Sequence, residues 1–101
     1  MDKSVPQIGQ IAKVLRGRDP GEYAVIIGIV DTRFVLLADG DKRKFDSPKK
    51  KNLNHLQIQN AISSEVESSI RETGRVTNAK LRFAIAHFVD RLRVEAQEKG
   101  E

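Results

Sequence analysis

The chain of 101 residues has no cysteine and no tryptophan, and its aromatic residues are four phenylalanines and one tyrosine. Without cysteine it can form no disulfide, no thiolate nucleophile and no cysteine–zinc site, which is compatible with a reducing compartment. No apolar run approaches the roughly 20 residues of a membrane span. The N-terminal residues Met1–Ser4 lack the apolar stretch of a signal peptide. These absences predict a soluble, cytoplasmic protein that does not enter a membrane.

Length and composition favour one small folded domain. At about 100–200 residues per domain, 101 residues make one domain or one domain with an appendage. Hydrophobic residues make up 39% of the chain and charged residues 32%, which is too apolar for disorder and too polar for a membrane protein. We expect one modest core and no large enclosed pocket.

The positive charge is concentrated in one part of the chain. Residues 1–59 hold eleven lysines and arginines against seven acids, which accounts for the whole net charge of +4, whereas residues 60–101 hold seven of each. Within the first part, residues 42–51 carry six basic side chains and one acid, Asp46. The two parts also differ in hydrophobic periodicity, which indicates two structural units.

The first unit reads as strands. We expect short strands at 9–16, 22–30, 33–38, 42–45 and 54–59, because these segments are apolar or alternating and are separated by turn residues. Pro20 and Gly21 are placed for a tight turn between the first two strands. Gly28, inside the most apolar strand, suggests a bulge. Five short strands joined by tight turns favour a small antiparallel barrel over residues 8–60, preceded by a tail at 1–7.

The second unit reads as two helices over residues 61–97. Ser64 and Glu67 form a capping-box pattern, and Gly74 fits the end of the first helix. Thr77 or Asn78 can cap the second helix. Its apolar residues follow helical spacing: Leu81, Ala84, Ile85, Phe88, Val89 and Leu92. We expect an α+β protein in which a helical hairpin packs on the barrel and enlarges its small core, with a frayed tail at 98–101.

No catalytic or metal constellation stands out. His55 and His87 lie in different units and lack metal-ligand spacing, and His87 is most simply a surface or packing residue. Residues 39–41 resemble a fragment of a calcium loop without its bidentate glutamate, so a turn is the better interpretation. We expect no enzyme activity, no metal and no cofactor.

The basic segment points instead to a polyanion. Two runs of three basic residues, at 42–44 and 49–51, can neutralise phosphates and release their condensed counterions. The turn Arg16-Gly17-Arg18 adds guanidinium groups, which grip phosphate bidentately or stack on a base. The plainer alternative is a solvated loop that aids solubility, because like-charge runs are common on surfaces. Tyr23, beside the turn, could stack a base, but a half-buried tyrosine at a strand start is the more common case.

The segment from Ile8 to Ile26 resembles a KOW motif. Gly9 matches the opening glycine of that motif, Gly17 the loop glycine before a basic residue, and Gly21 the glycine before the returning strand. The later elements Val-Leu-x-x-Asp-Gly at 35–40 and Asn-x-x-His-Leu at 52–56 resemble strands of the L14e-type ribosomal proteins. The resemblance covers residues 8–59, and the whole chain looks like short bacterial KOW domain-containing RNA-binding proteins.

The resemblance implies an SH3-like barrel that binds RNA. Its RNA-contacting loop maps to Arg16, Gly17 and Arg18, its variable basic connection to residues 42–51, and His55 matches a frequent His or Arg before Leu. A surface or edge-strand histidine remains an equal alternative for His55. The candidate RNA-binding residues are Lys13, Arg16, Gly17, Arg18, Lys42, Arg43, Lys44, Lys49, Lys50, Lys51, Asn52 and His55.

Two functions from different classes follow. The first is a non-catalytic, monomeric RNA-binding protein that contacts structured ribosomal RNA through its basic loops. The second is a protein-interaction module of the transcription or translation machinery, because SH3-like KOW domains of the NusG family also bind proteins. The C-terminal helices, whose charge is balanced, would suit such a protein partner.

Overall fold

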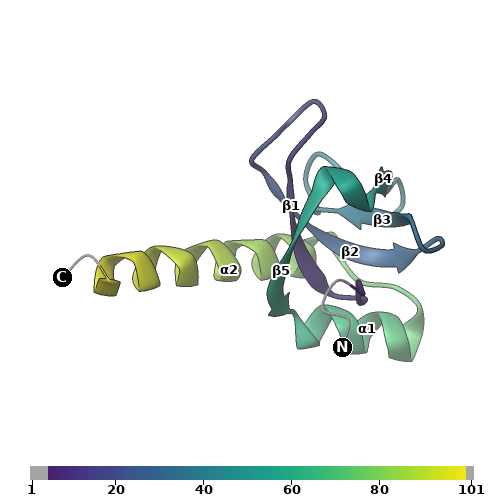
Figure 1. Cartoon of the computed structure of the whole chain (residues 1–101). Helices are drawn as coiled ribbons and strands as arrows, with labels where there is room; N and C mark the ends of the chain where they lie inside the picture. Colours follow the sequence, from purple (N-terminus) through teal and green to yellow (C-terminus); the bar gives the residue numbers. More distant parts are fainter. Residues whose placement is uncertain (1–4, 100–101) are drawn as a thin grey trace.

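The computed structural model describes residues 5–99, in which five strands precede two helices (Figure 1). The α+β class expected from the sequence is confirmed. The elements are β1 (Gln10–Val14), β2 (Tyr23–Ile29), β3 (Phe34–Ala38), β4 (Lys49–Asn52), the 3-10 turn η1 (Leu53–His55), β5 (Leu56–Ile62), α1 (Ser64–Thr73) and α2 (Asn78–Lys99). Residues 1–4 and 100–101, which belong to the two expected tails, lie outside the described residues. Residues 98 and 99, also assigned to a tail, belong to α2.

The five strands form one antiparallel sheet in the order β4-β3-β2-β1-β5. The arrangement is barrel-like, but the sheet is not closed: within residues 5–99, β4 and β5 form no ladder. The turn η1 spans this gap at one end instead. Leu53 N donates to Arg33 O and Leu15 N donates to His55 O, both at 2.8 Å, so η1 is tied to the ends of both neighbouring hairpins.

Two strand predictions need correction. The segment 42–45 is not a strand, and the fourth strand is β4, at Lys49–Asn52. Asp39 Oδ1 accepts hydrogen bonds from the amides of Asp41 and Arg43, at 2.8 and 2.9 Å, and thereby folds this segment into a turn. The last strand begins at Leu56 rather than at 54, because Asn54 and His55 belong to η1.

The bulge expected at Gly28 is present. The register between β2 and β3 shifts between Ile26 and Gly28. A Cβ atom on Gly28 would lie 3.0 Å from Leu36 Cδ1, so the two strands approach closely at this point. A larger residue would therefore press on the Leu36 side chain at the place where β2 bends, which favours a glycine there.

The sheet packs on both of its faces. On one face Ile11 and Val25 meet Val66 of α1 and Leu81 of α2, all at most 2% exposed. On the other face a second cluster is formed by Ala12, Ala24, Ile26, Val35, Leu37 and Leu56. Since neighbouring residues of a strand point to opposite faces, the apolar runs of β1, β2 and β3 supply both clusters. Among residues 5–99, α-helices cover the first cluster, whereas Leu53 of η1 packs on the second.

The N-cap residue of α1 lies one position earlier in the chain than the sequence suggests. Ser63, not Ser64, is the N-cap, and its Oγ accepts from Val66 N at 3.2 Å. Glu67 instead pairs with Arg71 at 3.0 Å along the helix surface. The predicted end at Gly74 is confirmed, with a left-handed φ of 76°.

The second helix packs on the sheet over its first half only. Thr77 Oγ1 accepts from Lys80 N at 3.2 Å, which confirms one of the two expected caps. Leu81 and Ala84 are buried and Phe88 meets Tyr23 edge to face at 5.2 Å, but Leu92 is 37% exposed. A helix of 22 residues is about 33 Å long, whereas the 7-residue strands span about 23 Å. The distal half of α2 therefore projects beyond the sheet, as Figure 1 shows.

Candidate nucleic-acid interface

The loop between β1 and β2 lies beside β4. This loop, residues 15–22, protrudes from the sheet in Figure 1. Gly17 has a φ of 126°, and a Cβ atom at this position would overlap Lys51 Nζ. The expected turn Arg16-Gly17-Arg18 and the lysines of β4 are therefore brought together, although more than 30 residues separate them in the chain.

A cleft of about 320 Å³ opens between the loop and the strand. We call it the cation groove and define it by Gly17 and five basic residues that line it: Arg18, Lys42, Arg43, Lys49 and Lys51. Three acids also line the cleft: Asp19, Glu22 and Asp39. Half of the candidate RNA-binding residues thus share one surface.

The alternation of β4 divides its three lysines. Lys49 lies opposite Leu37 and Lys51 opposite Val35, so both share the face of β3 that carries the second apolar cluster and both line the cation groove. Lys50 lies on the other face, with its Nζ 4.7 Å from the centre of the Phe34 ring. The run of three lysines is therefore not a single patch.

Among the cations of the groove, Lys42 forms ion pairs with acidic side chains. Its Nζ lies 3.7 Å from Asp19 Oδ1 and 3.5 Å from Glu22 Oε1. The negative charge of Asp19, followed by that of Glu22, raises the pKa of Lys42. All three side chains are about half exposed, so solvent screens the attraction. The pairs tie the β3–β4 loop to the β1–β2 loop across the mouth of the groove.

The other cations of the groove are free to meet an external anion. Within residues 5–97, no carboxylate oxygen lies within ion-pair distance of Arg18, Arg43, Lys49 or Lys51. Arg18, Arg43 and Lys49 are exposed, and Lys51 is half-buried against the backbone of Gly17. Four unpaired positive groups around one cleft attract phosphate and can bind it through charge-assisted hydrogen bonds.

The remaining candidates lie outside the groove. Arg16 and Lys44 are exposed in the two loops, and Lys13 lies opposite Tyr23, on the face of the sheet that the helices cover. Asn52 Oδ1 accepts from Asn54 N at 2.8 Å and so caps η1. His55 is in η1 rather than in a strand, and its backbone carbonyl binds Leu15 N.

The sequence reading missed the role of Asp19 and Glu22. Both acids follow the basic turn directly, in the run Arg18-Asp19-Pro20-Gly21-Glu22, and this interleaving of signs was the available signal. Tyr23 also lines the groove, but its ring packs against Phe88, which fits the half-buried tyrosine that the sequence favours.

Comparison with known proteins gives relatives that cover most of this chain. No protein-family model matches it. It is 52% identical over 71 residues to the Bacillus subtilis protein named "Putative ribosome-binding protein YbzG", an overlap that covers 70% of this chain and 96% of that protein. It is 30% identical over 78 residues to the "Large ribosomal subunit protein eL14" of Sulfolobus acidocaldarius (67% and 79% covered), and 28% identical over 81 residues to the protein of the same name from Metallosphaera sedula (72% and 84%).

Proposed function

The chain belongs to the L14e-like family, together with YbzG and the eL14 proteins, and on this basis we propose that it is a non-catalytic ribosome-binding protein that contacts structured ribosomal RNA. A protein that binds ribosomes would be located in the cytoplasm. The single observation that supports RNA as the ligand is the cation groove, where Arg18, Arg43, Lys49 and Lys51 surround one cleft without an ion-pair partner among residues 5–97.

The groove binds the phosphate backbone in this proposal. Lys49 and Lys51 stand two residues apart on one face of β4, so their ammonium groups can follow successive phosphates. Arg18, at the tip of the protruding loop, offers a planar guanidinium that grips one phosphate bidentately or stacks on an exposed base. The groove thus supplies affinity and position, whereas sequence or shape preference comes from neighbouring surfaces.

The test compares two variants of equal charge. We expect Lys49→Ala/Lys51→Ala to weaken binding to purified large-subunit ribosomal RNA and to lower the slope of log affinity against log salt by about 2, one unit for each lost phosphate contact. The matched control is Lys44→Ala/Lys50→Ala, which removes the same charge from the same segment but outside the groove. Filter binding at several salt concentrations measures both slopes.

Equal losses in the two double variants would show that only net charge matters and would contradict the groove. Arg18→Ala should weaken binding without changing the fold, since its side chain is exposed. Co-sedimentation with ribosomes in a sucrose gradient extends the test: association that survives in the Lys49→Ala/Lys51→Ala variant at physiological salt would argue against RNA capture by this surface.

The second candidate function is binding to a protein of the translation machinery. It is favoured by the distal half of α2, where Leu92 and Val94 are 37% and 50% exposed on a helix that projects from the body. Such a complex would resist nuclease, whereas an RNA-mediated one would not. Nuclease treatment of the sedimenting complex therefore separates the two candidates.

A further inference from the structure

One aromatic pair on α2 is not used by the core. Phe83 is 62% exposed, the most exposed large apolar side chain among residues 5–99. Its ring stacks on that of His87, with the centroids 6.0 Å apart and the planes 13° from parallel. The two rings are therefore nearly parallel, and most of Phe83 stays in solvent despite this contact.

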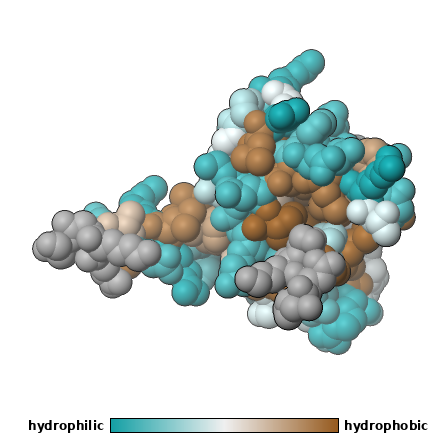
Figure 2. Space-filling view, in the orientation of Figure 1, coloured by the Kyte–Doolittle hydropathy of each residue, from teal (hydrophilic) through white to brown (hydrophobic). Residues whose placement is uncertain are grey.

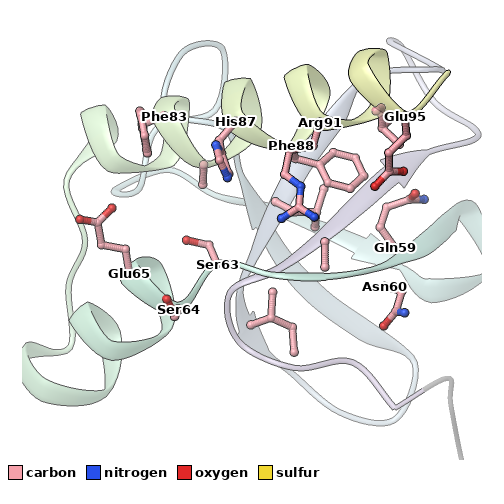
Figure 3. A pocket seen from close by; sticks show the side chains of 15 residues that line it. Gln59, Asn60, Ser63, Ser64, Glu65, Phe83, His87, Phe88, Arg91 and Glu95 are labelled. Carbon is pink, nitrogen blue, oxygen red and sulfur yellow. The ribbon is translucent and has the colours of Figure 1, made fainter. Parts of the chain in front are cut away.

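Arg91 extends this pair into a stripe of planar groups. Phe83, His87 and Arg91 are spaced by four residues, so each is displaced by about 6 Å along the helix from the one before. We call these three residues the planar stripe. Figure 3 shows His87 and Arg91 directed from α2 towards β5. An aromatic ring, an imidazole and a guanidinium are the side-chain groups on which unpaired RNA bases stack.

The planar stripe forms one wall of a groove of about 660 Å³. We call it the helix–strand groove, because its other wall is the end of β5 and the start of α1 (Figure 3). That wall carries the hydroxyl of Ser64, which makes no side-chain hydrogen bond within residues 5–97, whereas Figure 3 shows the Asn60 amide on the side of β5 away from α2. A hydroxyl can both donate and accept, as the edge of a nucleobase requires.

The two grooves meet at one aromatic contact. Tyr23 lines the cation groove and Phe88 lines the helix–strand groove, and their rings touch edge to face at 5.2 Å. The cation groove lies on the face of the sheet with the second apolar cluster and the helix–strand groove on the helix-covered face, so an RNA that fills both must pass around the Tyr23–Phe88 contact. Glu65 and Glu95 border the helix–strand groove and would repel phosphates. The backbone would be held at the cation groove and only a base would enter the second groove.

We propose that the planar stripe binds an unpaired base of the RNA, stacked on Phe83 and His87 while Ser64 bonds its edge. The proposal rests on the proposed RNA-binding function and adds the kind of RNA, one with a bulged or looped-out base. A protein ligand fits the stripe less well. Phe83 is its only apolar member, and the exposed aliphatic residues that line the groove, Ile62 and Leu92, lie outside the stripe.

The experiment uses two RNA hairpins that differ only in one bulged nucleotide, 2-aminopurine, whose fluorescence falls when it stacks. We expect the wild-type chain to bind the bulged hairpin about tenfold or more tightly than the fully paired one. We expect Phe83→Leu, which keeps apolar bulk but removes the ring, to abolish most of this preference and the fluorescence change. Binding to the paired hairpin should stay unchanged.

Two controls separate this proposal from the proposed function. Val94→Ala removes an exposed apolar side chain of the same helix and should retain the preference, whereas Lys49→Ala/Lys51→Ala should weaken both hairpins alike and keep the preference. Absence of a preference in the wild type, or its survival in Phe83→Leu, would overturn the stacking site. Loss of a nuclease-resistant complex in Phe83→Leu with hairpin binding unchanged would assign the stripe to a protein and would overturn it as well. If Lys49→Ala/Lys51→Ala leaves the affinity for both hairpins unchanged while Phe83→Leu removes the preference, the proposed role of the cation groove is wrong and the proposed stacking site is supported.

Discussion

The cation groove and the helix–strand groove differ in what they offer a ligand. The first has four unpaired cations on loops and on an edge strand, with little fixed shape around them. The second has both signs of charge at its border and a row of planar groups on a helix. Charge on flexible side chains favours any polyanion, whereas a stack of planes on a rigid element discriminates among its parts. The comparison teaches that the most basic segment of a chain marks where RNA is held and not necessarily where it is read.

Removal of a core side chain under α2 should have the largest effect on stability. It should also affect RNA binding at the two grooves differently. Leu81 is fully buried between α2 and the sheet. We expect Leu81→Ala to lower the free energy of unfolding by about 2–5 kcal/mol, a large share of the roughly 5–15 kcal/mol of a small domain. Thermal and urea denaturation followed by circular dichroism measure this loss.

The same variant tests whether the grooves are independent. Because the cation groove is built from β4 and two loops, affinity for a paired RNA should survive in folded Leu81→Ala, while the preference for a bulged base should fall. A milder variant, Leu81→Val, keeps the fold if the alanine variant does not. Equal losses in both RNA assays would mean that the grooves form one unit.

Removal of the two acids of the cation groove should have a smaller effect, and in the opposite direction. We expect Asp19→Asn/Glu22→Gln to free Lys42, to tighten binding of paired RNA, and to raise the salt slope by about 1. The preference for the bulged base should stay as it is. The control is Glu72→Gln/Asp90→Asn, which makes the same change in net charge at acids that line neither groove. Weaker binding in the first variant would show instead that the ion pairs position the β1–β2 loop for its ligand.

The ionisation of Asp31 should change the free energy of unfolding by the smallest amount. It should not change RNA binding at either groove. The amides of Arg33 and Phe34 donate to Asp31 Oδ1 at 2.8 and 2.9 Å, and these bonds lower the pKa of the carboxyl below its usual value of 3.8. A lowered folded-state pKa stabilises the fold above the ordinary value, and this contribution is lost as the pH falls through the lowered pKa.

Urea unfolding of the wild type and of Asp31→Ala across pH 7 to pH 2 measures this contribution. The wild type should be slightly more stable at neutral pH, and the two curves should converge below about pH 4. RNA affinity at pH 7 should be equal in both proteins. A constant difference in stability at all pH values would mean that the carboxylate charge has no part in holding the β2–β3 turn.

The order of the helices and strands and the location of the positive charge could be predicted from the sequence, because both are local properties. The turn at Pro20-Gly21, the bulge at Gly28 and the helix end at Gly74 each follow from one residue and its neighbours. The segment 42–45 misled because its apolar and basic residues look like a strand, while the Asp39 carboxylate, three residues earlier, folds the backbone into a turn.

The pairing of charges is not a local property, and the sequence cannot reveal it. Lys42 meets Asp19 and Glu22 only because two hairpin loops come together, and Gly17 meets Lys51 for the same reason. The exposure of Phe83 is a local property instead, because the helical spacing of Leu81, Ala84 and Phe88 already leaves Phe83 off the face that packs on the sheet.

Because side chains of β4 alternate between the two faces of the sheet, the order of its residues, and not only their composition, determines which lysines line the groove. Lys49 and Lys51 face the cation groove and Lys50 faces Phe34. A single serine inserted before Lys49 would leave net charge and isoelectric point unchanged, yet a shift of one position sends each side chain to the opposite face. The groove would then receive one lysine in place of two. For this chain, a reading-frame-preserving insertion of one codon could therefore alter RNA affinity as much as the loss of a charge, and an alignment scored by charge alone would overlook it.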